Sequence, residues 1–101
     1  MSDRFKTFSD FYPFYKSEHS TRWCRRLHFT GSTLVLVALV IFVISLDFRW
    51  LIAAPFLGYG FAWVGHFFFE KNKPATFKNP VYSLMGDWVM FWDIIRGTIA
   101  F

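Results

Sequence analysis

The fold is decided by LHFTGSTLVLVALVIFVISL, residues 27–46, a run without a single Asp, Glu, Lys or Arg. A helix needs about 20 mainly apolar residues to cross a hydrocarbon core of roughly 30 Å. A second apolar run of similar length, residues 50–69, follows after the short link 47–49. The two runs therefore predict an all-α, integral membrane protein built on a transmembrane hairpin.

The composition agrees with this prediction. The chain has 101 residues, of which 54% are hydrophobic and 24% aromatic. One domain of this size cannot bury so much apolar surface in its own core, so we expect residues 1–101 to form a single membrane-embedded domain covered by lipid. The net charge of +4 comes from residues that flank the apolar runs, which favours anionic lipid headgroups over nucleic acid as the partner.

Small residues mark the expected packing face of the second run. Ala54, Gly58, Ala62 and Gly65 are spaced four, four and three positions apart. Small side chains at helical spacing let two membrane helices approach closely. This stripe predicts close packing against residues 27–46.

The single cysteine, Cys24, excludes an intramolecular disulfide and a CxxC metal site.

Residues 1–26 mix Phe and Tyr with Lys and Arg, a composition typical of a segment that lies in the headgroup layer. We therefore expect an N-terminal interfacial arm. Pro13 is expected to interrupt any helix that begins at Ser9 or Asp10, so that a second short helix carries Glu18 and His19.

The C-terminal segment, residues 79–101, begins with Asn79 as a helix N-cap and Pro80 at the first helical position. It is long enough to cross a membrane, but Asp87, Asp93 and Arg96 fall inside it. Two alternatives remain open, a third span and a re-entrant or membrane-surface helix. Asp93 and Arg96, three positions apart, are expected to pair with each other.

Basic residues predict the orientation of the hairpin, because cytoplasmic flanks of membrane helices carry an excess of Lys and Arg. The link contains only Arg49, whereas both outer flanks are rich in cations: Arg4, Lys6, Lys16, Arg22, Arg25 and Arg26 before the first run, and Lys71, Lys73 and Lys78 after the second. Both ends of the hairpin should therefore face the cytoplasm, across the inner membrane in a bacterium or the endoplasmic reticulum in a eukaryote.

The three histidines are predicted to converge. Asp47 is nineteen residues from both His28 and His66, so an antiparallel hairpin brings these two side chains to the same depth at its cytoplasmic end. His19 reaches that depth from the arm, provided that the chain bends within residues 20–24. Glu18 and Glu70 lie next to this level in the sequence.

His66 in the second run and Glu70 directly after it are four positions apart, on one helix face with Tyr59 and Trp63. An imidazole and a carboxylate at this spacing can bind one metal ion or hydrogen-bond to each other. Ionisable groups inside a membrane are costly and usually functional. Three interpretations follow: a metal site, a b-type haem clamped by facing histidines, and a non-enzymatic scaffold in which the histidines only bridge helices. Three roles remain open for Asp87: a helix cap, a hydrogen-bonding partner of a metal ligand, or a metal ligand itself.

Four sequence blocks carry a resemblance: FYPFYKSEH (residues 11–19), RRLHFTG (25–31), GYGFAWVGHFFFEKNKPATF (58–77) and SLMGD (83–87). Together they resemble the family of small membrane proteins related to the fungal 2-hydroxy fatty acid dioxygenase. The likeness covers nearly the whole chain, and the long block that ends in PATF is quite specific. One departure is the segment after Glu18-His19, where many relatives have an Asn-Pro-type turn and this chain has residues 20–24 STRWC.

The resemblance implies an Fe(II)-dependent oxygenase that uses O₂ to shorten a long-chain 2-hydroxy fatty acid by one carbon, with membrane lipid around it. The family's histidine motifs map onto His19, His28 and His66 as metal ligands. Glu18 and Glu70 become candidates for a carboxylate ligand or for orienting a histidine. The remaining candidates contact the substrate, with cations steering its carboxylate and aromatic residues lining its acyl chain: Arg25, Arg26, Lys71, Tyr59 and Trp63.

Overall fold

The computed structural model describes residues 5–73 and 78–101, so Arg4 and residues 74–77 of the long block lie outside it. Within these ranges every regular element is helical, which confirms the all-α prediction. The elements in chain order are α1 (Phe8–Ser17), α2 (Arg22–Ser45), α3 (Phe48–Val64), the π-helix η2 (Gly65–Glu70) and α4 (Pro80–Ile95).

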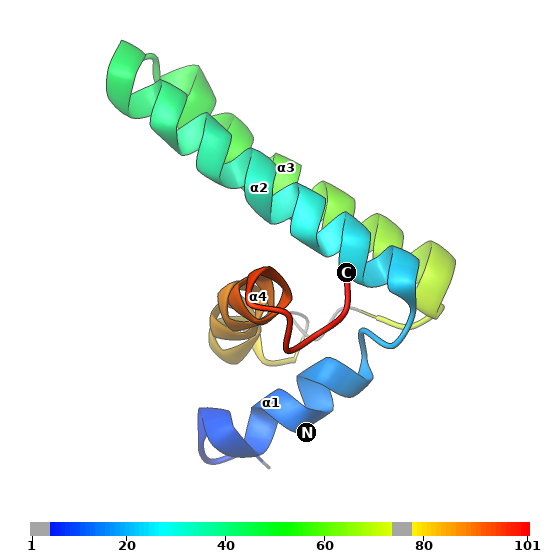
Figure 1. Cartoon of the computed structure of the whole chain (residues 1–101). Coiled ribbons are helices and arrows are strands. Elements are labelled where there is room, and N and C mark those ends of the chain that lie inside the picture. Colours follow the sequence, from blue (N-terminus) through cyan, green and yellow to red (C-terminus); the bar gives the residue numbers. More distant parts are fainter. Residues whose placement is uncertain (1–4, 74–77) are drawn as a thin grey trace.

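Helices α2 and α3 run side by side in opposite directions and form the predicted hairpin (Figure 1). The helices Arg22–Ser45 and Phe48–Glu70 are both long and apolar enough to cross a membrane. The first therefore begins earlier than the predicted residue 27. The link is also shorter than predicted, because α3 begins at Phe48: Leu46 closes α2 with φ 54°, and the Asp47 side chain accepts a hydrogen bond from the Arg49 amide.

The predicted small-residue stripe is confirmed. Ala54 and Ala62 are buried. A Cβ added at Gly58 would lie 3.0 Å from Val35 Cγ2, and one at Gly65 would lie 3.1 Å from Cys24 Sγ. Small residues on α3 and η2 therefore set the distance between the two helices, as close packing in membranes requires.

We expect Gly31→Ala to destabilise the hairpin by about 1–3 kcal/mol, the usual cost of overpacking. A Cβ at Gly31 would lie 2.9 Å from Phe61 Cβ and 3.1 Å from the Gly58 carbonyl oxygen, so the backbones would have to separate. Gly60→Ala is the matched control, because an added Cβ there meets nothing within 4 Å. Thermal unfolding in detergent measures both, and equal melting temperatures for the two variants would contradict the packing account.

Helices α1 and α4 pack together at the end of the hairpin that is remote from the link (Figure 1). Their shared core consists of Phe11, Tyr15, Met90 and Ile94. In Figure 1 α4 is seen nearly end-on, whereas the hairpin crosses the picture, so α4 does not run alongside α2 and α3. With 16 residues it is also shorter than the predicted 79–101 segment and too short for a full crossing. The alternative of a third span is therefore not supported.

The segments on either side of the hairpin differ from the sequence prediction at Pro13 and agree with it at Asp93 and Arg96. The predicted break at Pro13 is wrong, because α1 continues through Pro13 and His19 follows the helix instead of lying on a second one. The amide that Pro13 lacks would have bonded to the carbonyl of Ser9, an exposed residue, so the missing bond costs little. The pairing of Asp93 with Arg96 is confirmed, at 2.9 Å between Oδ1 and Nη2.

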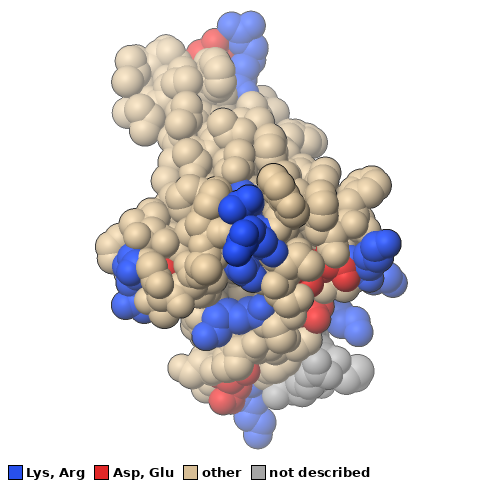
Figure 2. Space-filling view, turned by 45° about the vertical axis from the view of Figure 1, so that its right-hand side comes forward, with Lys and Arg blue, Asp and Glu red and all other residues tan. Residues whose placement is uncertain are grey.

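The surface charge follows this architecture. Figure 2 shows no charge on the visible face of the middle part of the hairpin, its shaft, and a small charged group at the tip of the hairpin, where the link lies. The lower half of the molecule carries most of the visible Lys and Arg, together with several Asp and Glu. At the link, Arg49 Nη2 lies 2.7 Å from Asp47 Oδ2, so these two charges offset each other. The apolar shaft suits a hydrocarbon environment.

Candidate metal centre

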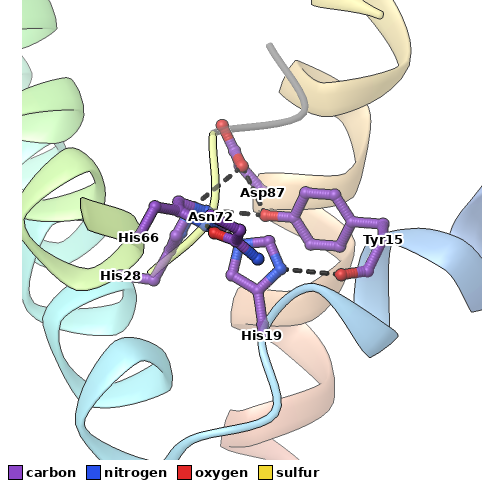
Figure 3. Close-up of polar contacts among 6 residues, drawn as sticks. All are labelled: Tyr15, His19, His28, His66, Asn72 and Asp87. Carbon is purple, nitrogen blue, oxygen red and sulfur yellow. Dashed lines mark hydrogen bonds and ion pairs between the residues drawn. The ribbon is translucent and has the colours of Figure 1, made fainter. Parts of the chain in front are cut away.

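The three histidines come from three elements and meet at one point (Figure 3). His19 lies in the turn between α1 and α2, His28 on α2 and His66 on η2. One ring nitrogen of each lies within 4.8 Å of those of the other two. All three side chains are buried, with 1%, 6% and 2% exposure. The predicted convergence is confirmed.

Residues 18–21 make the bend that brings His19 to this point, slightly earlier than predicted. Arg25 Nη1 donates hydrogen bonds to the carbonyl oxygens of His19, at 3.2 Å, and Ser20, at 2.8 Å. The Glu70 carboxylate accepts from Ser20 Oγ at 2.9 Å and from the Thr21 amide. These contacts tie the turn to α2 and to the end of η2, so the position of His19 is fixed from both sides.

His66 lies on η2, where the helix widens to π geometry. Lys71 ends this helix with φ 58°, and the Asn72 amide bonds back to the His66 carbonyl oxygen at 3.0 Å. Short π-helical segments are rare and occur frequently at functional sites. Here the turn at Lys71 folds the chain back so that the Asn72 side chain reaches the His66 ring.

The hydrogen bonds fix the protonation of two histidines. His19 Nδ1 lies 2.7 Å from the Tyr15 carbonyl oxygen, and His66 Nδ1 lies 2.8 Å from Asn72 Oδ1. The orientation of the Asn72 amide is set by its nitrogen, which lies 3.3 Å from both the carbonyl and a carboxylate oxygen of Glu18. Because both partners of the Nδ1 atoms are acceptors, each Nδ1 carries the hydrogen and donates it.

The Nε2 atoms of His19 and His66 therefore face each other with lone pairs, 2.9 Å apart. Two lone pairs at this distance repel unless a proton or a cation lies between them. Burial, assisted by neighbouring His66, lowers the pKa of His19 to about 3, so a proton is a poor solution at neutral pH. Histidines that bind metals typically donate the other ring N–H to a carbonyl or carboxylate, as both do here. The residues present thus fit a divalent metal ion.

Tyr15 and Asp87 lie beside the third histidine. Tyr15 Oη donates to Asp87 Oδ1 at 2.5 Å, and His28 Nε2 lies 3.3 Å from Asp87 Oδ1 and 3.4 Å from Tyr15 Oη. Burial raises the pKa of Asp87 to about 7, and that of Tyr15 is also raised, first by burial and then by the Asp87 charge. Asp87 therefore lies at ion-pair distance from His28 and accepts its hydrogen bond from Tyr15, so it is a partner of a candidate ligand, one of the three alternatives left open by the sequence.

The structure keeps the predicted carboxylates outside the group of nitrogens that could share an ion. Glu18 reaches His66 only through Asn72, and Glu70 binds the turn at residues 20–21. Sequence reasoning missed Asn72 and Tyr15. The one available signal for Tyr15 was its position four residues before His19, and Asn72 gave none, because its reach depends on the turn at Lys71.

The predicted substrate contacts are dispersed. Arg25 binds backbone carbonyl oxygens of the 18–21 turn and of Ala100, and the Arg26 guanidinium lies over the rings of Trp23 and Phe101. Lys71 is exposed at the end of η2. Tyr59 lines the cavity described next, whereas Trp63 does not. Of these five residues, only Tyr59 therefore lines the cavity that His28 and Asp87 also line.

A cavity of about 370 Å³ runs between α2, α3 and α4. One end is polar, formed by His28 and Asp87. The remaining walls are mostly apolar and come from all three helices: Ser32, Val35, Leu39, Leu51, Ala54, Pro55, Gly58, Tyr59, Leu84 and Trp88. A space with a polar group at one end and mostly apolar walls suits an amphiphile with a long tail.

Comparison with known families matches residues 5–99 to the family described as "2-hydroxy-palmitic acid dioxygenase Mpo1-like". The match includes the three histidines, Tyr15, Asn72 and Asp87. Searches of curated proteins and of solved structures found no match. Since the family match covers nearly the whole chain, the protein belongs to the Mpo1-like family.

Proposed function

We propose that this protein is a membrane-bound, Fe(II)-dependent dioxygenase that shortens long-chain 2-hydroxy fatty acids by one carbon. The observation that carries the proposal is the pair of facing Nε2 atoms of His19 and His66, each backed by a donating Nδ1. Three buried histidine nitrogens are a donor set that suits iron among other divalent metals. The family description supports a 2-hydroxy acid as the substrate.

The cavity gives this substrate a place. On α2 its lining residues recur once per turn from His28 to Leu39, a length of about 16 Å at 1.5 Å per residue. A carboxylate and hydroxyl at the His28 end would lie next to the histidines, while the alkyl tail lies along the apolar walls. The apolar shaft of the hairpin lets such a tail reach the cavity from the bilayer.

The residues of the site would have separate roles in the reaction. His19, His28 and His66 hold the metal, while the Tyr15 carbonyl and Asn72 orient two of the rings. When bound there, Fe(II) supplies open positions at which O₂ and a chelating 2-hydroxy acid meet. If C1 leaves as carbon dioxide and one water forms, the substrate itself provides all the electrons that O₂ accepts, so no further reductant is required.

The charge distribution supports a cytoplasmic site. The histidines lie at the end of the hairpin where cations gather, whereas at the opposite tip Arg49 is offset by Asp47. An excess of Lys and Arg marks the cytoplasmic side. Exposed Lys71 lies on the same side and would attract the substrate carboxylate. Arg25 and Arg26 add to this field, although their guanidinium groups are engaged with the protein itself.

The reaction can be tested directly. Supplied with Fe(II) and O₂ in lipid, the protein should convert 2-hydroxypalmitic acid to the acid one carbon shorter. Palmitic acid should react far more slowly, because it lacks the second oxygen needed for chelation. Mass spectrometry of the products measures both, with His28→Ala as the inactive control. Equal turnover of the two acids would contradict the proposal, as would no turnover of either by iron-loaded, folded protein.

The two other interpretations of the histidines are less consistent with the geometry. A haem clamped between His28 and His66, whose ring centroids are 6.1 Å apart, would have to pass through the space of the His19 ring, which lies 4.8 and 4.4 Å from them. A purely structural role would leave the two facing Nε2 atoms without a hydrogen between them.

A further inference from the structure

Two tyrosine–aspartate hydrogen bonds join α1 to α4, and they differ in what else the carboxylate contacts. Tyr12 Oη donates to Asp93 Oδ2 at 2.6 Å, and Tyr15 Oη donates to Asp87 Oδ1 at 2.5 Å. Asp93 is also paired with Arg96 and does not line the cavity. Asp87 does line it, and its charge is not offset by any Lys or Arg within the described residues. The first bond is explained by packing α1 on α4, whereas the second leaves a carboxylate facing a ligand space.

Asp87 has unused hydrogen-bonding capacity at that point. Its Oδ1 takes the hydrogen of Tyr15 and lies 3.3 Å from His28 Nε2. Its other oxygen, Oδ2, has no hydrogen-bond partner in the described part of the chain, and the side chain is 17% exposed. Asp87 lines the cavity, so a ligand that lies there can donate a hydrogen bond to this free acceptor.

A 2-hydroxy acid has two polar groups near its end, the carboxylate and the 2-hydroxyl, and only one of them can donate a hydrogen bond to Asp87. The substrate carboxylate has no hydrogen to give, so it cannot donate to Asp87. The 2-hydroxyl has one hydrogen, and donating it leaves the oxygen lone pairs free for a cation held by the histidines. Asp87 and His28 both line the cavity, so a substrate whose polar head lies beside them would bring its 2-hydroxyl group next to this acceptor.

We infer that Asp87, positioned by Tyr15, is the residue that recognises the 2-hydroxyl group by accepting its hydrogen. This inference rests on the proposed function, since it names how the same site selects its substrate. A site built to bond a hydroxyl discriminates strongly against analogues that lack it, because its own polar group is then left unpaired. Selectivity for hydroxylated acids would thus come from α4, in addition to chelation by the metal.

The test compares binding rather than turnover. Dissociation constants for 2-hydroxypalmitic and palmitic acid are measured by calorimetry on iron-loaded wild type, Asp87→Asn and Asp93→Asn. Asparagine at 87 keeps an oxygen for Tyr15 but turns the other acceptor into a donor. We expect the preference for the hydroxylated acid to fall on the order of ten- to a hundred-fold in Asp87→Asn. Asp93→Asn alters the other tyrosine–aspartate bond between α1 and α4, so this variant should keep the wild-type preference for the hydroxylated acid.

A second ligand keeps the test valid if Asp87→Asn does not fold. The 2-methoxy acid retains oxygen lone pairs for chelation but has no hydrogen to donate, so wild type should bind it about ten-fold or more weakly than the hydroxy acid. Equal binding of these two acids, or an unchanged preference in folded Asp87→Asn, would overturn the role of Asp87 alone. No preference of wild type for hydroxylated over plain acid would overturn both this role and the proposed substrate class.

Discussion

Replacing His66 with alanine is expected to remove most of the bound iron while leaving the hairpin inserted. The change deletes one of the two facing Nε2 atoms, and the remaining donors come from His19 and His28. Insertion should persist, because the apolar residues of α2 and α3 that drive it are untouched. Iron is measured by elemental analysis of membrane-extracted protein, and insertion by resistance of the hairpin to alkaline extraction.

The same loss is expected for His28→Ala and His19→Ala, since all three nitrogens lie within 4.8 Å of one another. Ser83→Ala is a matched control: Ser83 is also buried at this end of the molecule, and its hydroxyl has no partner in the described ranges. It should keep wild-type iron. Full iron in His28→Ala or His66→Ala would show that the three histidines do not share one ion.

Asn72→Ala is expected to weaken iron binding by about 10- to 100-fold, the usual effect of losing a group that orients a metal ligand. Asn72 accepts the Nδ1 hydrogen of His66 and is itself held by Glu18, so without it the ring can rotate and the tautomer is no longer fixed. Competition with a chelator of known affinity measures the change.

Lys73→Ala serves as the comparison for that experiment. Lys73 is exposed and lies one position further along the same turn, so its removal alters charge but not the histidine network. Identical iron affinities in Asn72→Ala and Lys73→Ala would mean that the His66 ring is held by packing alone.

The hairpin and the common depth of His28 and His66 could be predicted from sequence, because both depend on the lengths of the apolar runs and of the link. Two apolar runs of spanning length joined by a minimal link leave one arrangement, and the equal separation of His28 and His66 from Asp47 then fixes their common depth. The packing face of α3 could also be predicted, because small residues such as Gly58 recur at helical spacing along that face.

The surroundings of the histidines could not be predicted in this way. Asn72 reaches His66 only because η2 widens to π geometry and Lys71 turns with positive φ, and neither feature has a pattern in the sequence. Similarly, Tyr15 meets Asp87 only through the crossing of α1 and α4, which no periodicity specifies. The prediction of a break at Pro13 was wrong for a local reason. Pro13 lies in the second turn of α1, and the carbonyl group left without a hydrogen bond belongs to Ser9, an exposed residue, so the helix tolerates the proline.

Metal analysis of protein purified without oxygen tests the central claim most directly. Two facing imidazole lone pairs in a buried three-histidine cluster should retain iron in amounts stoichiometric with the chain, and the absorption spectrum should contain no Soret band. A folded protein that carries no metal, and takes up none when Fe(II) is supplied, would contradict the account, as would a Soret band.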